Sequence, residues 1–403
     1  MDDAAQFHRR RVAGGVMSQF AIKGWCPGAL RPMRSGDGLV VRIRPHGGRL
    51  SQVQATGIAE LAERFGNGLM DVTNRANLQI RGVSDAGHMP LIERLARLDL
   101  IDADPDAEAL RNIVVTPFWV KGDDTASLVA ELEPALAARH LSLPVKFGFA
   151  VDCGAARALA DTSADIRIER DATGGLIVRA DGAEHGRPVT RSDTVKLALD
   201  LAEWFIASGG VANGRGRMAA HLAAGATLPV GLTGLAIPAR MMPPPRPGLL
   251  DRGALVGFAF GQLKAATLRA LAKEADGLRL TPWRMLFVEG RRDMPQGDGL
   301  VTEADDPILR VIACSGAPSC KEAHAETRAL AAALAVHMPA DSRLHVSGCA
   351  KGCAHPGPAP LTLVATTHGF DLVRDGSARD VPVLRGLHRD QIVADPSLLG
   401  RAG

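Results

Sequence analysis

The feature that most constrains the fold of this 403-residue chain is an internal repeat. Residues 38–83 and 253–290 each read as a strand rich in β-branched residues, a Gly-x-Leu turn, an amphipathic helix and a second strand. From Thr73 to Gly82 and from Thr281 to Gly290 the interval is nine residues, and only the middle of the repeat differs, by five residues. We interpret this as a duplication; chance resemblance between strand–helix–strand segments is the alternative.

A second pair of similar segments follows the first pair. One series has a strand within 111–120, a helix near 124–138 and a strand within 144–154 that ends at a Gly/Cys loop. The other has a strand within 308–320, a helix from Lys321 to about His337 and a strand within 343–353. Between them, residues 241–250 (MMPPPRPGLL) form a Pro-rich stretch where a domain boundary is expected.

Composition indicates an ordinary globular protein with no nucleic-acid or membrane partner. The chain is 46% hydrophobic and 23% charged, and its net charge of +3 gives no field that would draw it onto a polyanion. No uncharged apolar run approaches the roughly 18 residues that span a bilayer. The N-terminal MDDAAQFHRRR has no apolar core of a secretory signal, so we predict a cytoplasmic location.

Four of the six cysteines lie close together near the C-terminus. The spacing is C-x5-C, then 28 residues, then C-x3-C, with Gly and Pro around each pair: Cys314, Cys320, Cys349 and Cys353. Four thiolates on two loops are a ligand set for iron–sulfur or zinc. The long, uneven spacing favours a cubane iron–sulfur cluster, with zinc and unmetallated thiols as alternatives. Cys26 and Cys153 have no nearby partner and are predicted to be small buried residues.

Two further groups of side chains are candidates for binding. His324, His345 and His355 flank the cysteine loops and are expected to donate hydrogen bonds or pack there rather than bind metal. The stretch 31–49 carries five arginines against a single Asp37, which indicates either a solvated surface or a site for a polyanion.

Together these segments resemble the sulfite/nitrite reductase superfamily over about residues 20–370. The motifs are TNRANLQIRG, RNIVVTP, LPVKF and the cysteine set. The resemblance implies an α+β fold with a pseudo-twofold axis: ferredoxin-like half-domains at 18–85 and 249–300, and reductase-like domains at 86–248 and 301–403. It also implies that the four cysteines hold a 4Fe-4S cluster, with Cys353 as the bridge if a haem were present.

One departure from the superfamily pattern changes the expected chemistry. Arg75 and Arg111 match the arginines that surround the oxyanion in the reductases. The family's P-x-K-F-K motif reads Pro-Val-Lys-Phe-Gly here, so Lys146 is kept and Gly148 replaces the second lysine. Losing an ammonium from a dry pocket weakens its field on a compact anion, and Gly148 is expected to leave room in its place.

GWCPGALRPM, PVKFGFAVDCG and GLRLTPWR resemble one branch of the superfamily, which uses O2 to hydroxylate precorrin-3A and form a lactone in aerobic cobalamin biosynthesis. The branch implies a 4Fe-4S cluster and a mononuclear non-haem iron, and no siroheme. Lys146, Arg75 and Arg111 are the implied catalytic residues. Bidentate guanidinium groups would hold the substrate's carboxylates; the candidates are Arg42, Arg44, Arg49, Arg75, Arg81, Arg111 and Arg284.

Several points stay open at this stage. We find no defensible 2-His-1-carboxylate spacing for the non-haem iron. No G-x-G-x-x-G follows a strand, so reducing equivalents are expected from an external NAD(P)H-linked reductase or a ferredoxin. A siroheme-dependent sulfite or nitrite reductase and a non-catalytic tetrapyrrole-binding protein are the alternative functions.

Overall fold

The computed structural model describes residues 27–102 and 104–400. The predicted start of the first half-domain at residue 18, and Cys26, lie outside these residues. The described chain forms two compact units, a larger one of residues 27–34 and 38–304 and a smaller one of residues 35–37 and 305–400. Among the helices described, none is long and apolar enough to cross a membrane.

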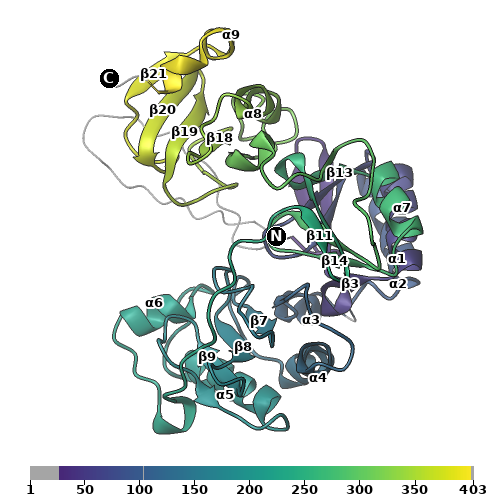
Figure 1. The fold of residues 1–403 in the computed structure, drawn as a ribbon, viewed down its shortest axis with the longest axis vertical. Coiled ribbons are helices and arrows are strands. Elements are labelled where there is room, and N and C mark those ends of the chain that lie inside the picture. Colours follow the sequence, from purple (N-terminus) through teal and green to yellow (C-terminus); the bar gives the residue numbers. More distant parts are fainter. Residues whose placement is uncertain (1–26, 103, 401–403) are drawn as a thin grey trace, which may run out of the picture. The chain divides into compact units, whose positions relative to one another are not determined.

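The larger unit contains two similar antiparallel sheets with helices on one side (Figure 1). The first copy consists of β1 (Met33–Ser35), β2 (Gly38–Ile43), β3 (Arg49–Leu50), α1 (Gln52–Phe65), β4 (Leu69–Val72), β5 (Leu78–Val83) and α2 (Asp85–Ala96). The second consists of β11 (Gly248–Leu250), β12 (Gly253–Phe258), β13 (Gln262–Lys264), α7 (Ala265–Lys273), β14 (Leu278–Leu280), β15 (Met285–Glu289) and β16 (Leu300–Val301). The predicted α+β class is confirmed.

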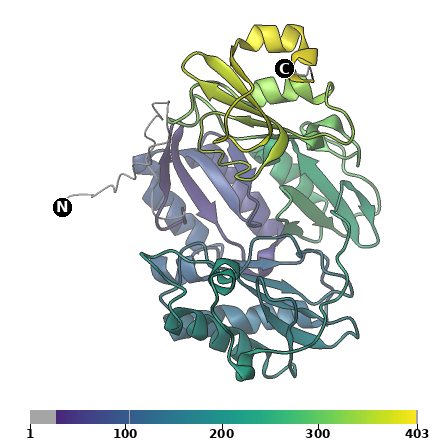
Figure 2. The same ribbon diagram turned by 90° about the vertical axis from the view of Figure 1, so that its left-hand side faces the viewer.

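The two copies exchange one short strand each. The sheet orders are β1-β2-β5-β4-β13 and β11-β12-β15-β14-β3, so β13 completes the first sheet and β3 completes the second. Helices α1 and α7 pack against each other, and apolar residues of both copies share one core. Figure 2 shows the purple strands of the first copy beside the green strands of the second. Each copy therefore depends on the other for its edge.

Backbone details repeat between the copies. Gly47 and Gly48 before β3 have φ of 59° and 68°, and Phe260 and Gly261 before β13 have 59° and 76°. In the loop before the last strand, the Thr73 hydroxyl accepts hydrogen bonds from the amides of residues 75 and 77. The Thr281 hydroxyl accepts from residues 283 and 285 in the same way.

A mixed α/β domain completes the larger unit. Its strands lie in the order β10-β9-β8-β7-β6, with β6, β7 and β8 parallel. The elements are α3 (Pro105–Leu110), β6 (Ile113–Val115), α4 (Asp124–Arg139), β7 (Phe149–Asp152), β8 (Ile166–Arg170), β9 (Leu176–Ala180), β10 (Arg187–Pro188), α5 (Thr194–Ala207) and α6 (Met218–Ala223).

The smaller unit repeats this arrangement. Its strand order is β17-β18-β19-β20-β21, with β17, β18 and β19 parallel. The elements are β17 (Val311–Ala313), α8 (Arg328–Ala335), β18 (Leu344–Ser347), β19 (Ala359–Thr366), β20 (Gly369–Gly376), β21 (Leu384–Leu387) and α9 (Arg389–Ala394).

The helix predicted from Lys321 is wrong at its start, because α8 begins only at Arg328. The preceding loop uses its backbone groups elsewhere: the His324 amide donates to the Gly348 carbonyl (2.8 Å) and the Ala317 amide to the Ala325 carbonyl (3.0 Å). A chain that spends its amides on a neighbouring loop cannot also form the i to i−4 bonds of a helix.

Candidate functional site

The cysteine loops lie at one edge of the sheet in the smaller unit. Strand β17 ends just before Cys314, and β18 ends two residues before Cys349. The strands are adjacent and parallel, with Ala313 opposite Val346, so both loops leave the same edge. The Gly348 amide donates to the Cys314 sulfur at 3.2 Å. The topology therefore brings the two cysteine pairs predicted from the sequence together.

Glycines allow the loops to approach closely. A Cβ on Gly348 would lie 2.7 Å from the Ala323 Cβ, and one on Gly36 would lie 2.0 Å from the Pro318 carbonyl oxygen. Gly36 also donates its amide to the Ser319 carbonyl at 3.0 Å. Three separate segments thus meet at the first cysteine pair, and side chains are excluded between them.

The four thiols interact electrostatically, although their side chains do not converge on one point. Burial raises the pKa of Cys349 and of Cys353, and Cys314 and Cys320 raise both further. Within the described residues, no three His, Cys, Asp or Glu side chains are placed to hold a single metal ion. The ligands of a cubane bind different irons and so stand farther apart than four ligands of one ion. The donor set and loop placement fit a 4Fe-4S cluster on these grounds.

The flanking histidines lie as follows. His345 is fully buried on β18, and its ring meets that of His355 edge to face at a centroid distance of 5.8 Å. The His355 Nε2 is 3.0 Å from the Pro358 carbonyl oxygen. These contacts are with a ring and a backbone group, and the role of the histidines beside the cysteine loops stays a prediction.

The arginine candidates belong to the larger unit, and Arg44, Arg49, Arg81 and Arg111 pair with carboxylates of described residues. Arg44, 7% exposed, forms an ion pair with Glu108 at 3.2 Å, and Arg81 pairs with Asp71 at 3.1 Å. Arg49 bonds Glu289 through two nitrogens. Arg111 bonds both oxygens of Asp102 at 2.7 Å. Burial opposes its charge, but Asp102 and Glu133 raise the pKa of Arg111 overall. That these arginines bind substrate stays a prediction.

Arg75 and Lys146 are brought together, close to where β7 begins. Both terminal nitrogens of Arg75 donate to the Lys146 carbonyl at 3.3 Å, while the Lys146 side chain is exposed. Arg42 lies on β2, where its amide donates to the Gly28 carbonyl. Arg284 lies in the loop before β15 with φ of 61°. Of the three predicted catalytic residues, Arg75 and Lys146 are therefore in direct contact.

The expectation that Gly148 leaves room is wrong. A Cβ at this buried position would lie 2.7 Å from Asn112 Nδ2 and 2.8 Å from the Asn112 carbonyl oxygen. Asn112 is itself held by a 2.7 Å hydrogen bond from its amide to the Phe147 carbonyl. The volume next to the Gly148 Cα is therefore filled by Asn112. The ammonium of the reductases' second lysine is missing here, and no empty space replaces it.

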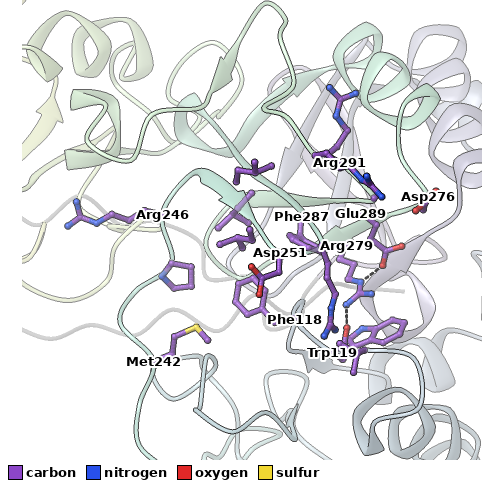
Figure 3. Close-up of a pocket in the computed structure, with 18 residues that line it drawn as sticks. Phe118, Trp119, Met242, Arg246, Asp251, Asp276, Arg279, Phe287, Glu289 and Arg291 are labelled. Carbon is purple, nitrogen blue, oxygen red and sulfur yellow. Dashed lines mark hydrogen bonds and ion pairs between the residues drawn. The ribbon is translucent and has the colours of Figure 1, made fainter.

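The larger unit also contains a cavity of about 900 Å³ that the sequence did not indicate (Figure 3). Phe118, Trp119 and Phe287 line it together with Arg279, whose guanidinium carbon is 3.7 Å from the centroid of the Trp119 ring. Arg279 also bonds the carboxylate of Glu289. Burial raises the pKa of Glu289, but Arg49 and Arg279 lower it overall. Aligning the two copies would have pointed here, because Arg279 and Glu289 occupy the places of Asp71 and Arg81.

The end of β7 carries a buried acid and a buried thiol. Burial is the main cause that raises the pKa of Asp152 to about 6 and that of Cys153 to about 12. The Leu159 amide donates to Asp152 Oδ2 at 2.8 Å. Cys153 is 4% exposed, which confirms its prediction as a small buried residue.

Comparison with known proteins places this architecture in a class. Residues 31–98 match the model of the nitrite/sulfite reductase ferredoxin-like half domain. The solved structure of the Mycobacterium tuberculosis NirA protein is similar with a TM-score of 0.61 and 17% identity, over 88% of this chain and 79% of that one. Fold and repeat together therefore define the fold class of the nitrite/sulfite reductases.

Relatives in sequence narrow the class. Ferredoxin–nitrite reductases match only in part: that of Synechococcus elongatus is 30% identical over 31% of this chain and 26% of its own length, and that of Leptolyngbya laminosa 27% identical over 38% and 29%. The precorrin-3B synthase of a Sinorhizobium species is 30% identical over 92% of this chain and 86% of its own. The chain belongs to the precorrin-3B synthase family.

Proposed function

We propose that this protein is a precorrin-3B synthase, which hydroxylates precorrin-3A with O2 and closes a lactone from a ring acetate in aerobic cobalamin biosynthesis. One oxygen atom of O2 enters the product and the other leaves as water, with two electrons and two protons supplied from outside. The observation that carries the proposal is the similarity to a precorrin-3B synthase over nearly the whole chain, where nitrite reductases match only about a third.

The anion chemistry of the larger unit supports this substrate class over a small oxyanion. Asn112 packs against Gly148, so the position that carries a second lysine in the reductases offers neither a charge nor space for one. The guanidinium of Arg75 and the exposed ammonium of Lys146 remain as donors that could orient a carboxylate. A reduced tetrapyrrole carries several carboxylates, which guanidinium groups bind in a bidentate manner.

Cys314, Cys320, Cys349 and Cys353 would hold the cluster, which supplies one-electron transfer when it is bound. The Gly348 amide already donates to Cys314 Sγ, and such hydrogen bonds favour the thiolate form of a ligand. No described group of side chains fits a mononuclear iron, so we derive no step through one. The electron donor would be a ferredoxin or an NAD(P)H-linked reductase, and we place the protein in the cytoplasm.

Anaerobically purified protein tests this proposal. We expect iron and labile sulfide in a ratio near unity or above, and no porphyrinoid. Incubation with precorrin-3A, a chemical reductant and isotopically labelled O2 should give a product heavier by one labelled oxygen atom in mass spectrometry. Stoichiometric siroheme with sulfite or nitrite reduction would instead select a reductase, and tight binding without turnover would select a tetrapyrrole carrier.

A further inference from the structure

The large cavity of the larger unit is built on the second copy of the repeat. Its walls come from the β11–β12 hairpin, from β14 and β15, from residues 118–120 and from the Pro-rich segment 242–246. A volume of about 900 Å³ is at the upper end of what small-molecule sites usually offer. The cavity is therefore large enough for a macrocycle.

Part of the cavity wall is a rigid aromatic cluster. Phe118 stacks on Trp283 with ring centroids 5.9 Å apart and an interplanar angle of 16°, and meets Phe287 edge to face at 5.9 Å. Leu255 and Phe287 are buried beneath the surface of the cavity. Aromatic faces held in fixed positions favour a flat apolar ring as ligand.

The cavity also carries more cations than anions. Five arginines line it against three acids: Arg246, Arg252, Arg279, Arg291 and Arg292 against Asp251, Asp276 and Glu289. Arg279 pairs with Glu289, and Arg291 pairs with Glu274 and Asp293 outside it. The exposed side chains of Arg246, Arg252 and Arg292, here called the rim arginines, make no hydrogen bond or ion pair with any described residue. Figure 3 shows Arg246 and Arg291 at opposite margins of the cavity, so cationic groups surround the apolar wall.

The same strands of the first copy carry arginines that the sequence assigns to substrate. Arg42 lies on β2 and Arg81 on β5, which correspond to β12 and β15 at the cavity. Because the two copies have the same strands and both carry guanidinium groups, we expect them to bind the same kind of ligand. This step, which selects the ligand class, rests on the proposed function.

We propose that this cavity is a second binding site for a flat tetrapyrrole with peripheral carboxylates, separate from the residues assigned to catalysis. The apolar face of the ring lies against the cluster of Phe118, Phe287 and Leu255, and the rim arginines contact the carboxylates. No helix N-terminus or glycine-rich loop lines the cavity within the described residues, so it lacks the usual cradle of a nucleotide phosphate.

Uroporphyrin I, a stable ring with carboxylates on every pyrrole, is the probe for this site. Calorimetric titration of the full-length protein should find two sites, one of which quenches tryptophan fluorescence through Trp119. In the triple variant Arg246→Ser, Arg252→Ser, Arg292→Ser the quenching site should bind at least about tenfold more weakly, from three exposed ionic contacts at several tenths of a kcal/mol each. Arg94→Ser with Arg97→Ser, two exposed arginines of the same unit, is the matched control and should keep both sites.

A second variant protects the test against loss of folding. Leu250→Glu changes a side chain that is already 40% exposed, and it should also weaken the quenching site by placing a carboxylate against the ring. Uroporphyrin binding that is identical in the wild type, the triple variant and Leu250→Glu would overturn the second site. Turnover of precorrin-3A is measured separately, so this outcome would leave the proposed function untouched. Displacement of uroporphyrin from the quenching site by stoichiometric FMN would overturn the assignment to tetrapyrroles.

Discussion

Thr116 and Cys314 occupy the same place in the two copies of the α/β fold. Each follows a first parallel strand, and the amide of each donates to the carbonyl of a valine on the next strand, Val151 at 3.0 Å and Val346 at 3.4 Å. Yet Thr116 is a buried residue, 3% exposed, whereas Cys314 is one of the four cysteines predicted to bind a cluster. The backbone is thus the same at this point of both copies, whereas the cysteine set predicted to bind a cluster occurs in the second copy alone.

The ferredoxin-like copies differ by an exchange of charge. Asp71 on β4 pairs with Arg81 on β5, whereas Arg279 on β14 pairs with Glu289 on β15. Both pairs are ten residues apart in sequence and largely buried. An ion pair can be reversed without loss when its surroundings are neutral, but here Arg49 also bonds Glu289. Because Arg49 lies on the exchanged strand β3, we expect that swapping the charges of Arg279 and Glu289 would cost stability in the second copy.

The largest expected effect concerns the cysteines, which distinguish the two copies of the α/β fold. Cys314→Ser or Cys349→Ser should abolish both the cluster and turnover, because a hydroxyl is a poor ligand for iron. Cys153→Ala is the control in the other copy and should retain the metal. Iron and sulfide analysis measures this, and full retention of both in the Cys314→Ser protein would rule out the ligand assignment.

The second prediction concerns the reversed ion pairs. Glu289→Ala leaves Arg49 and Arg279 without their carboxylate and should lower the free energy of unfolding by about 3–5 kcal/mol, as is typical for a broken buried pair. Asp71→Ala removes the carboxylate that pairs with Arg81 and should also lower the free energy of unfolding. Urea denaturation of both variants measures the difference.

Exchange of the partners sharpens the same point. Arg279→Glu with Glu289→Arg restores the polarity of the first copy but sets a cation beside Arg49, so the double variant should stay less stable than the wild type. Equal stability of the two would contradict a role for Arg49.

Asp152 ends β7 and Ser347 ends β18 at the matching place of the two α/β copies, and only Asp152 should make the stability depend on pH. Burial raises the pKa of Asp152 from 3.8 to about 6, so the folded chain binds this proton more tightly than the unfolded chain does. Its contribution to stability is thus fully present below about pH 4 and is lost as the pH rises through 6, by about 3 kcal/mol. Asp152→Asn should flatten that slope in denaturation measured from pH 4 to 7. Ser347 is uncharged and adds no such slope, and an unchanged profile in Asp152→Asn would refute the assignment.

The smallest expected effect tests the packing of Gly148. Gly148→Ala places a methyl group against Asn112 and should destabilise the protein by about 1–3 kcal/mol, a typical cost of overpacking. Gly231→Ala, at a position with no atom within 4 Å of the added Cβ, is the matched control and should cost far less. A Gly148→Ala protein as stable as the Gly231→Ala protein would show that Asn112 yields easily.

Much of this organisation is determined by the sequence alone, because it depends on local patterns. The loops at Thr73 and Thr281 are each held by hydrogen bonds between near neighbours in sequence, and the cysteine pairs are visible as spacing. The late start of α8 was missed because the loop before it is held by a contact distant in sequence, from the His324 amide to the Gly348 carbonyl.

What only the tertiary structure decided depends on contacts between segments far apart in the chain. The exchange of β3 and β13, the pairing of Arg49 with Glu289 and the packing of Asn112 on Gly148 each join residues that no local pattern relates. The cavity beside Phe118 arises in the same way, because residues 118–120 meet segments that begin only at Met242. Periodicity and spacing record how a segment folds, whereas steric fit and charge balance are settled only when distant segments meet.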